Sequence, residues 1–154
     1  MEWTEAKNGR VFVLRLEDGD ILHEVVERFA GEKGIAAATV VAVGGVDKGS
    51  ALVVGPEDGR AAEIKPMRME LPDIAEAAGC GTIFADDDGN PILHMHMACG
   101  RKDKTVTGCV RAGVKTWLVL EVVISEIVGA DALRKTDPKS GFKLLAVGGG
   151  NGQD

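Results

Sequence analysis

The chain has 154 residues, 45% of them hydrophobic and 27% charged, and its formal net charge is -6. This length suits a single domain with one core, and the composition is that of a globular protein. The negative charge and the 4% aromatic content disfavour direct binding of nucleic acid. No apolar run reaches the roughly 20 residues of a membrane span, and the N-terminus lacks a signal-peptide pattern. We therefore expect a soluble cytoplasmic protein.

The first expected elements are a strand and a helix. Residues 11–16 (VFVLRL) are rich in β-forming side chains and end in the turn EDGD. Asp20 then has the position of a helix N-cap, and apolar residues at helical spacing predict a helix over 21–32. Because glycine favours a helix end, the helix should stop at Gly31 or Gly34.

Two strands and an irregular stretch should follow the helix. Residues 35–43 (IAAATVVAV) predict a buried strand, and residues 50–54 (SALVV) predict a short one. Proline cannot donate a hydrogen bond to a sheet, so Pro66 and Pro72 make residues 64–80 edge-like or looped.

The second half of the chain is dominated by strands. A solvated acidic turn at Asp86–Asp88 separates the short run GTIF from three longer strands and a closing strand. Their expected ranges are 81–84, 91–99, 105–111, 116–128 and 142–147. The predicted fold class is α+β, a largely antiparallel sheet with one main helix in a single domain over 1–147. The glycine-rich tail, 148–154, should be disordered.

Two of the three histidines stand one residue apart in the run ILHMHMACG. In a strand, His94 and His96 project from the same face because side chains alternate. The segment GRKDK resembles the tip of a hairpin, and a four-residue loop at Arg101–Lys104 sets its register. That register places His96 opposite Cys109 and His94 opposite Arg111, and directly paired residues lie on one face of a sheet.

His94, His96 and Cys109 would then form a three-ligand metal cluster. Two imidazoles and a thiolate suit Zn²⁺, and zinc sites with three protein ligands usually keep a fourth position for water or substrate. Cys99 has the opposite parity and should point away, and Cys80 is not part of the cluster. A one-residue slip in the hairpin would turn Cys109 to the wrong face. The alternative is a pair of partly buried histidines with no metal.

Glu121 is a carboxylate within the apolar run WLVLEVVIS. A buried charge is costly unless it is paired, and the ring N–H of a metal-bound histidine is a natural partner. Strand parity groups Glu121 with Trp117, Val119 and Val123, which favours burial and a supporting role behind the metal ligands. The alternative is that Glu121 faces solvent from the open side of the sheet.

The segment PILHMHMACGRKDKTVTGCVRAG, followed by WLVLEVVISEI, resembles the plant-and-prokaryote-conserved (PPC) domain, as do the early stretch LRLEDGDILHEVVERF and the terminal TDPKSGFKLL. The resemblance implies a curved antiparallel sheet with few helices that assembles as a trimer. It also implies a histidine cluster of metal-binding type. The usual family pattern after the hairpin is Gly-Gly-His, and here Thr107, Gly108 and Cys109 stand in its place, so a cysteine replaces the third histidine.

Two functional hypotheses follow from the residues and the resemblance. The first is a zinc-binding homotrimer that holds a small-molecule ligand, or performs metal-assisted hydrolysis, at His94, His96 and Cys109. The second is a non-enzymatic trimeric assembly or DNA-associated domain with a structural metal. Plant members owe DNA binding to AT-hook segments, and this chain has no Arg-Gly-Arg-Pro hook. The sequence leaves open whether the protein is an enzyme.

Overall fold

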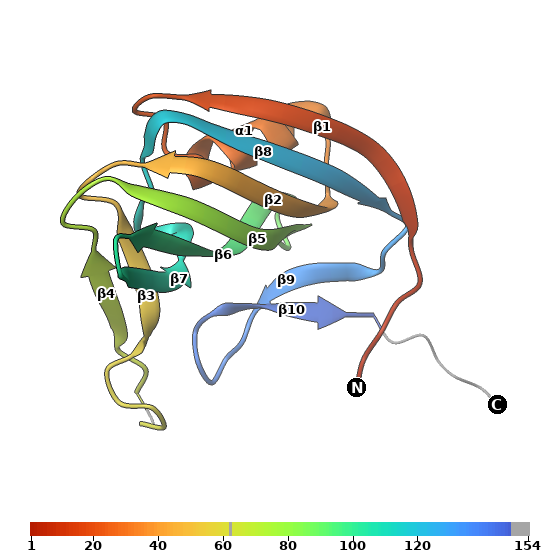
Figure 1. Cartoon of the computed structure of the whole chain (residues 1–154). Coiled ribbons are helices and arrows are strands. Elements are labelled where there is room, and N and C mark those ends of the chain that lie inside the picture. The colour runs from red at the N-terminus through yellow and green to blue at the C-terminus, as the bar shows by residue number, and fades with distance from the viewer. Residues whose placement is uncertain (62, 149–154) are drawn as a thin grey trace.

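One curved, eight-stranded antiparallel sheet dominates the protein (Figure 1), as seen in a computed structural model that describes residues 1–61 and 63–148. Its outermost strands do not pair with each other, so the sheet is open. The architecture agrees with the expected antiparallel sheet and single helix, although it is mainly β. In spatial order the strands are β1 (Lys7–Glu17), β8 (Thr116–Val128), β2 (Ala37–Val46), β5 (Ala75–Ala85), β6 (Pro91–Arg101), β7 (Lys104–Cys109), β3 (Ala51–Pro56) and β4 (Pro66–Glu70).

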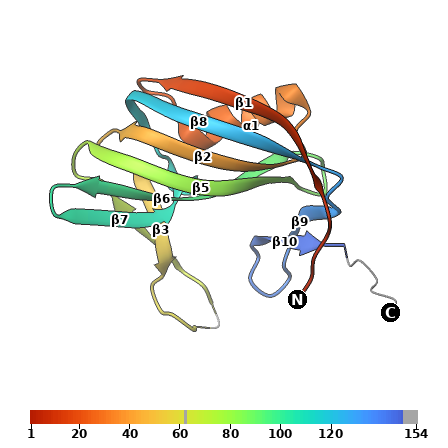
Figure 2. The same ribbon diagram turned by 45° about the vertical axis from the view of Figure 1, so that its right-hand side comes forward.

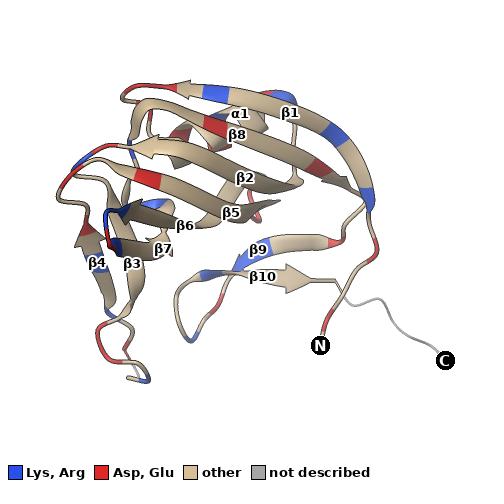
Figure 3. Ribbon diagram, viewed as in Figure 1, with Lys and Arg blue, Asp and Glu red and all other residues tan. Residues whose placement is uncertain are grey.

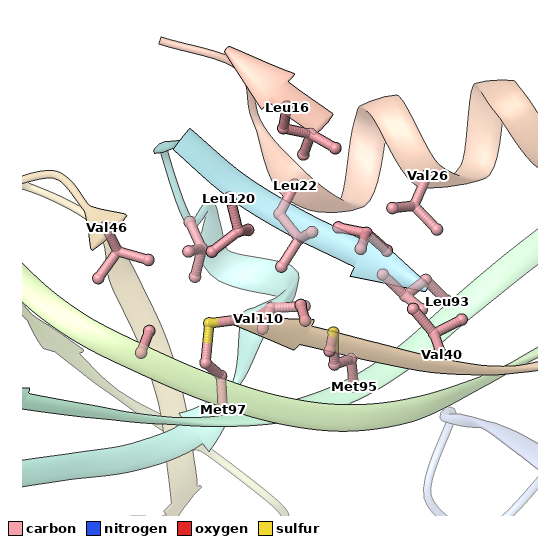
Figure 4. Packing of buried hydrophobic residues seen from close by; sticks show 14 of the residues in the cluster. Leu16, Leu22, Val26, Val40, Val46, Leu93, Met95, Met97, Val110 and Leu120 are labelled. Atoms are coloured by element: carbon pink, nitrogen blue, oxygen red, sulfur yellow. The ribbon is translucent and has the colours of Figure 1, made fainter. Parts of the chain in front are cut away.

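The core lies between one face of the sheet and helix α1 (Leu22–Lys33), which is amphipathic. The helix buries Leu22, Val26 and Ala30, one turn apart along a single stripe. On the sheet side, Met95 and Met97 of β6 are fully buried and point towards the helix (Figure 4). The histidines that alternate with these methionines therefore project from the opposite face.

The ends of α1 show one expectation confirmed and one overturned. Gly34 adopts a left-handed conformation, with φ 64°, and ends the helix as expected. Asp20 does not cap the helix: its Oδ2 accepts the backbone N–H of Glu17 at 2.9 Å. The carboxylate is used by the preceding turn, and Ile21 occupies the N-cap position without a side-chain hydrogen bond.

The stretch expected to be edge-like or looped over 64–80 is divided in the structure. Its first part forms β4, which is an exposed edge strand. Its last part is a correction, because Ala75 to Cys80 begin the central strand β5. Alanine and glycine have low strand propensity, so the sequence pattern did not predict this strand. In the structure its small residues allow β5 to pack closely between β2 and β6.

The C-terminal segment adds a two-stranded sheet of β9 (Ala132–Thr136) and β10 (Lys143–Val147) beneath the main sheet (Figure 2). The closing strand was expected, but β9 was not. Asp86 links the hairpin to the main sheet. Its Oδ2 accepts a hydrogen bond from Lys143 Nζ at 2.6 Å, and the two side chains form an ion pair. Asp86 is buried, so the acidic turn is not simply solvated as expected.

The described part of the chain contains no helix long and apolar enough to cross a membrane. The expected disordered tail, 148–154, falls almost entirely outside the described residues, of which Gly148 is the last.

Candidate metal centre

Three potential metal donors meet on the face of the sheet opposite the helix. One ligand atom from each of His94, His96 and Cys109 lies within 4.8 Å of the others. The two imidazole rings are 5.1 Å apart between centroids and nearly perpendicular, at 83°. Cys109 is buried, His94 is partly buried and His96 is exposed, so the cluster runs from the interior to the surface.

The hairpin register predicted from the sequence is confirmed. His96 pairs with Cys109 across β6 and β7, and the register continues without a shift to the pair Arg101 and Lys104. The turn is tighter than expected, because only Lys102 and Asp103 connect the strands. The expected pair of His94 with Arg111 does not form, since β7 ends at Cys109 and the 3-10 helix η1 (Val110–Ala112) follows.

The other two cysteines differ in position. Cys99 points into the core, as expected, and burial raises the pKa of its thiol to about 11. Cys80 is exposed and pairs with His96 from the neighbouring strand β5, so it projects from the same face as the cluster. Its sulfur is not among the three grouped donors.

Two glycines of β5 hold the histidine strand close. A Cβ atom added at Gly81 would lie 2.5 Å from the carbonyl oxygen of His94, and one at Gly79 would lie 2.7 Å from that of His96. Both distances are far inside van der Waals contact. Only glycine at these positions lets β5 and β6 approach as they do, and this approach fixes the backbone that carries the donors.

The donor set fits a zinc ion. Zinc–nitrogen bonds of about 2.0–2.1 Å and zinc–sulfur bonds of about 2.3 Å put tetrahedral donors roughly 3.5 Å apart. The three donor atoms all lie within 4.8 Å of one another, so a zinc ion between them would require them to approach by about 1 Å. The pKa of His94 is lowered, mainly by burial of its ring. The nearby positive charges of Arg134 and Arg111, and then His96, lower this pKa further. This favours the neutral imidazole, which is the form that binds a metal.

The expectation that Glu121 is buried behind the metal ligands is wrong. Glu121 is exposed, and β2 and β5 lie between its strand, β8, and the histidine strand β6. Three strand spacings amount to about 14 Å, which is too far for contact with His96 within one chain. The parity was correct, but the face that carries Glu121 is the open one, while Leu120, Val122 and Ile124 fill the core.

A cavity of about 730 Å³ adjoins the cluster, and His94 forms part of its wall. Residues from β3, β4, β5, β6, η1, β9 and β10 line it. The apolar wall includes Ile92, Phe142 and Leu144. His94 belongs both to the donor cluster and to this wall, so the cluster and the cavity are neighbours.

Arg134 and Arg111 are the residues of this region whose role the sequence did not reveal. Arg134 comes from β9 and its Nη2 donates to Thr82 Oγ1 at 3.1 Å, beside His94, which pairs with Thr82. Arg111 donates from Nε to Cys109 Sγ at 3.3 Å. An arginine in a short, unpredicted strand gives no sequence signal of burial.

The fold and the donor cluster define a class of protein, and comparison with known families agrees. The profile of the Plants and Prokaryotes Conserved (PCC) domain matches residues 3–128. The chain therefore belongs to this family, as the resemblance to the PPC domain implied. No curated protein matches the chain at a significant level.

Three solved structures are similar to the chain. A metal-containing protein of Archaeoglobus fulgidus is 27% identical with a TM-score of 0.80, over 95% of this chain and 99% of that one. A PPC protein of Pyrococcus horikoshii is 21% identical with a TM-score of 0.81, over 95% and 97%. A Ralstonia eutropha protein described as a supposed DNA-binding protein is 20% identical with a TM-score of 0.66, over 88% and 90%. The last two show the fold alone.

Proposed function

We propose that this chain is a zinc-binding protein that holds a small organic ligand beside the metal. His94, His96 and Cys109 are the proposed metal ligands. The observation that carries the proposal is the double role of His94, which is one of the three grouped donors and also lines the 730 Å³ cavity. Ligand pockets typically enclose about 300–1,000 Å³, and this cavity lies within that range.

The metal-containing relative from Archaeoglobus fulgidus supports a metal in this fold. Three protein ligands leave one tetrahedral position for a ligand group. A bound zinc ion supplies Lewis acidity to a group placed there, and hydrolysis is the enzymatic form of this proposal. The protein's own contribution is to orient the ligand in the cavity. A thiolate among the ligands suits a reducing compartment such as the cytoplasm.

We further propose that the protein assembles as a homotrimer through the open face of the sheet. Five valines are exposed there on three adjacent strands, and Val13 and Val41 are 78% and 54% exposed. We call them the valine face: Val11, Val13, Val41, Val43 and Val123. β2 carries no charged residue, and the exposed Glu121 of β8, which pairs with Val43 and with Arg15, lies at one end of this face (Figure 3). An apolar patch of this kind marks an interaction surface. Closed symmetry is the usual way to cover such a patch.

Zinc binding is tested by thermal unfolding of the full chain after chelation and after addition of zinc. A hundredfold excess of zinc over its Kd stabilises a folded protein by about 2.7 kcal/mol. For a chain of this size that stabilisation raises Tm by roughly 5–10 °C. We expect this shift in the wild type and not in His96→Ala. An equal shift in His96→Ala would contradict the proposed ligand set.

An open metal position is tested with cobalt in place of zinc. Azide should change the visible spectrum of the cobalt protein if a fourth position is free for a ligand. An unchanged spectrum at saturating azide would favour the alternative, an assembly domain with a structural metal.

The DNA-associated form of that alternative is tested by a mobility shift. With a net charge of -6, we expect no DNA shift at physiological ionic strength.

A further inference from the structure

Arg134 is a buried cation to which the described residues supply no counter-ion. Only 5% of its surface is exposed, and its Nε has no hydrogen-bond partner. Among the described residues no carboxylate forms an ion pair with it. Within residues 1–61 and 63–148, its one hydrogen bond to a side chain is to the neutral hydroxyl of Thr82. An unpaired buried charge is costly, so an anionic ligand that pairs with Arg134 would relieve that cost and gain affinity from it.

The surroundings of Arg134 add positive charge. Arg134, Arg111 and Arg68 all line the cavity, together with Lys143, which is already paired with Asp86. No aspartate or glutamate is among the described residues of the wall. Burial lowers the pKa of Arg134 and so does the nearby Arg111, while Cys109 raises it. The described wall therefore carries several cationic side chains and no carboxylate to balance them, and a zinc ion would add further positive charge.

We propose that Arg134 and Arg111 bind the carboxylate of a small organic acid whose apolar body lies against Ile92, Phe142 and Leu144. Guanidinium groups bind carboxylates through paired N–H donors, which gives orientation as well as affinity. The apolar wall requires a body that is itself apolar. This deepens the proposed function by naming its ligand class. It rests on that proposal only for the neighbouring metal, because the cationic wall exists without one.

A carboxylate fits better than a phosphate. Arg134 is almost completely buried, so its partner must lose most of its hydration. A monoanion with two oxygens pays a smaller desolvation cost than a phosphate, which carries nearly two charges at neutral pH. The apolar wall also gives an inorganic anion nothing to contact.

The test is calorimetric titration of the metal-free full chain with benzoate. Benzyl alcohol is the uncharged control, and phenyl phosphate and inorganic phosphate are the phosphate arms. We expect benzoate to bind more tightly than all three. Arg134→Met and Arg111→Gln should each weaken benzoate by about tenfold to a hundredfold, the range for losing hydrogen bonds to a charged group. Arg28→Gln, which removes an exposed arginine of α1, should change it less than twofold.

Arg134→Met also distinguishes a loss of benzoate binding from a loss of folded protein. Because it replaces an unpaired buried charge with an apolar side chain of similar length, we expect it to keep or raise Tm while it loses benzoate. Equal binding of benzoate by wild type, Arg134→Met and Arg111→Gln would overturn the proposal. So would equal binding of benzyl alcohol, or tighter binding of either phosphate probe. Since metal is absent, failure here is distinct from failure to bind zinc.

Discussion

At the scale of single residues, the sulfur of Cys109 has surroundings that the other two cysteines lack. It lies close to the imidazoles of His94 and His96 and accepts a hydrogen bond from Arg111 Nε, whereas Cys99 is buried in the core. We expect Cys109→Ser to weaken zinc binding on the order of a hundredfold or more. The free energy of zinc binding in structural sites is roughly 10–16 kcal/mol and is shared among a few ligands, so the loss of one ligand removes a large part of it. Competition with a chromophoric chelator measures this.

The matched controls are the other cysteines. Cys99→Ser should leave zinc affinity nearly unchanged, as should Glu121→Gln, since that carboxylate is exposed three strands away. Cys80→Ser should also leave it unchanged. A large loss in Cys80→Ser would instead make this cross-strand neighbour of His96 a ligand.

The sequence predicted the three donors because strand alternation and hairpin register are local rules. His94 and His96 share a face by parity, and the short connection after Arg101 brings Cys109 opposite His96. Arg134 escaped prediction because its burial depends on where a distant hairpin packs. Glu121 was placed on the wrong side because β8 is apolar on both faces, so polarity could not say which face was the core.

At the scale of elements, the spacing of β5 and β6 depends on glycine. Gly81→Ala would place a Cβ 2.5 Å from the His94 carbonyl oxygen, so the two strands must separate locally. We expect a loss of about 1–3 kcal/mol in unfolding free energy, as for overpacking, and weaker zinc binding as well. Urea unfolding and the chelator competition measure the two effects. Gly59→Ala, in open space, should change neither.

An ion pair next to the turn of the β9–β10 hairpin, between Lys143 and Asp86, holds the hairpin to the main sheet. Hydrogen bonds from Lys143 and from the backbone N–H of Asn90 and Asp88 lower the pKa of Asp86 to about 2. The unfolded chain binds this proton more readily, with a pKa of about 3.9. The pair therefore stabilises the fold fully above about pH 4, and its contribution is lost as pH falls through about 2.

Asp86→Asn should accordingly lose stability at about pH 5 and show a smaller further loss at about pH 2.5 than the wild type does. The urea midpoint at the two pH values measures this. Asp103→Asn, in the exposed hairpin turn, should behave as the wild type. An equal acid loss in Asp86→Asn and the wild type would show that other carboxylates, such as Glu126 with Arg10, dominate.

Element prediction was accurate where residues have strong strand preference and weak where they do not. The valine-rich strand over 116–128 was predicted with its observed limits. The first half of β5, AEAAGC, has little strand preference and is held by its neighbours on both sides. Pairing with neighbouring strands therefore determines the secondary structure of segments whose local propensity is weak.

At the scale of the whole molecule, the valine face is the proposed interface of the trimer. Val41→Glu places a charge within this face and should convert the proposed trimer to monomers in sedimentation at micromolar concentration. Met69→Glu, on the edge strand β4, removes an exposed apolar side chain elsewhere and should leave the trimer intact. A wild-type monomer would contradict the assembly proposal.

The central claim is that His94, His96 and Cys109 together hold one zinc ion, and X-ray absorption at the zinc edge tests it most directly. The zinc-loaded wild type should show one sulfur at about 2.3 Å and histidine nitrogens at about 2.0–2.1 Å. In Cys109→Ser the sulfur signal should disappear, and in Cys99→Ser it should remain. A wild-type spectrum without sulfur, or a sulfur signal that persists in Cys109→Ser, would contradict the proposed centre.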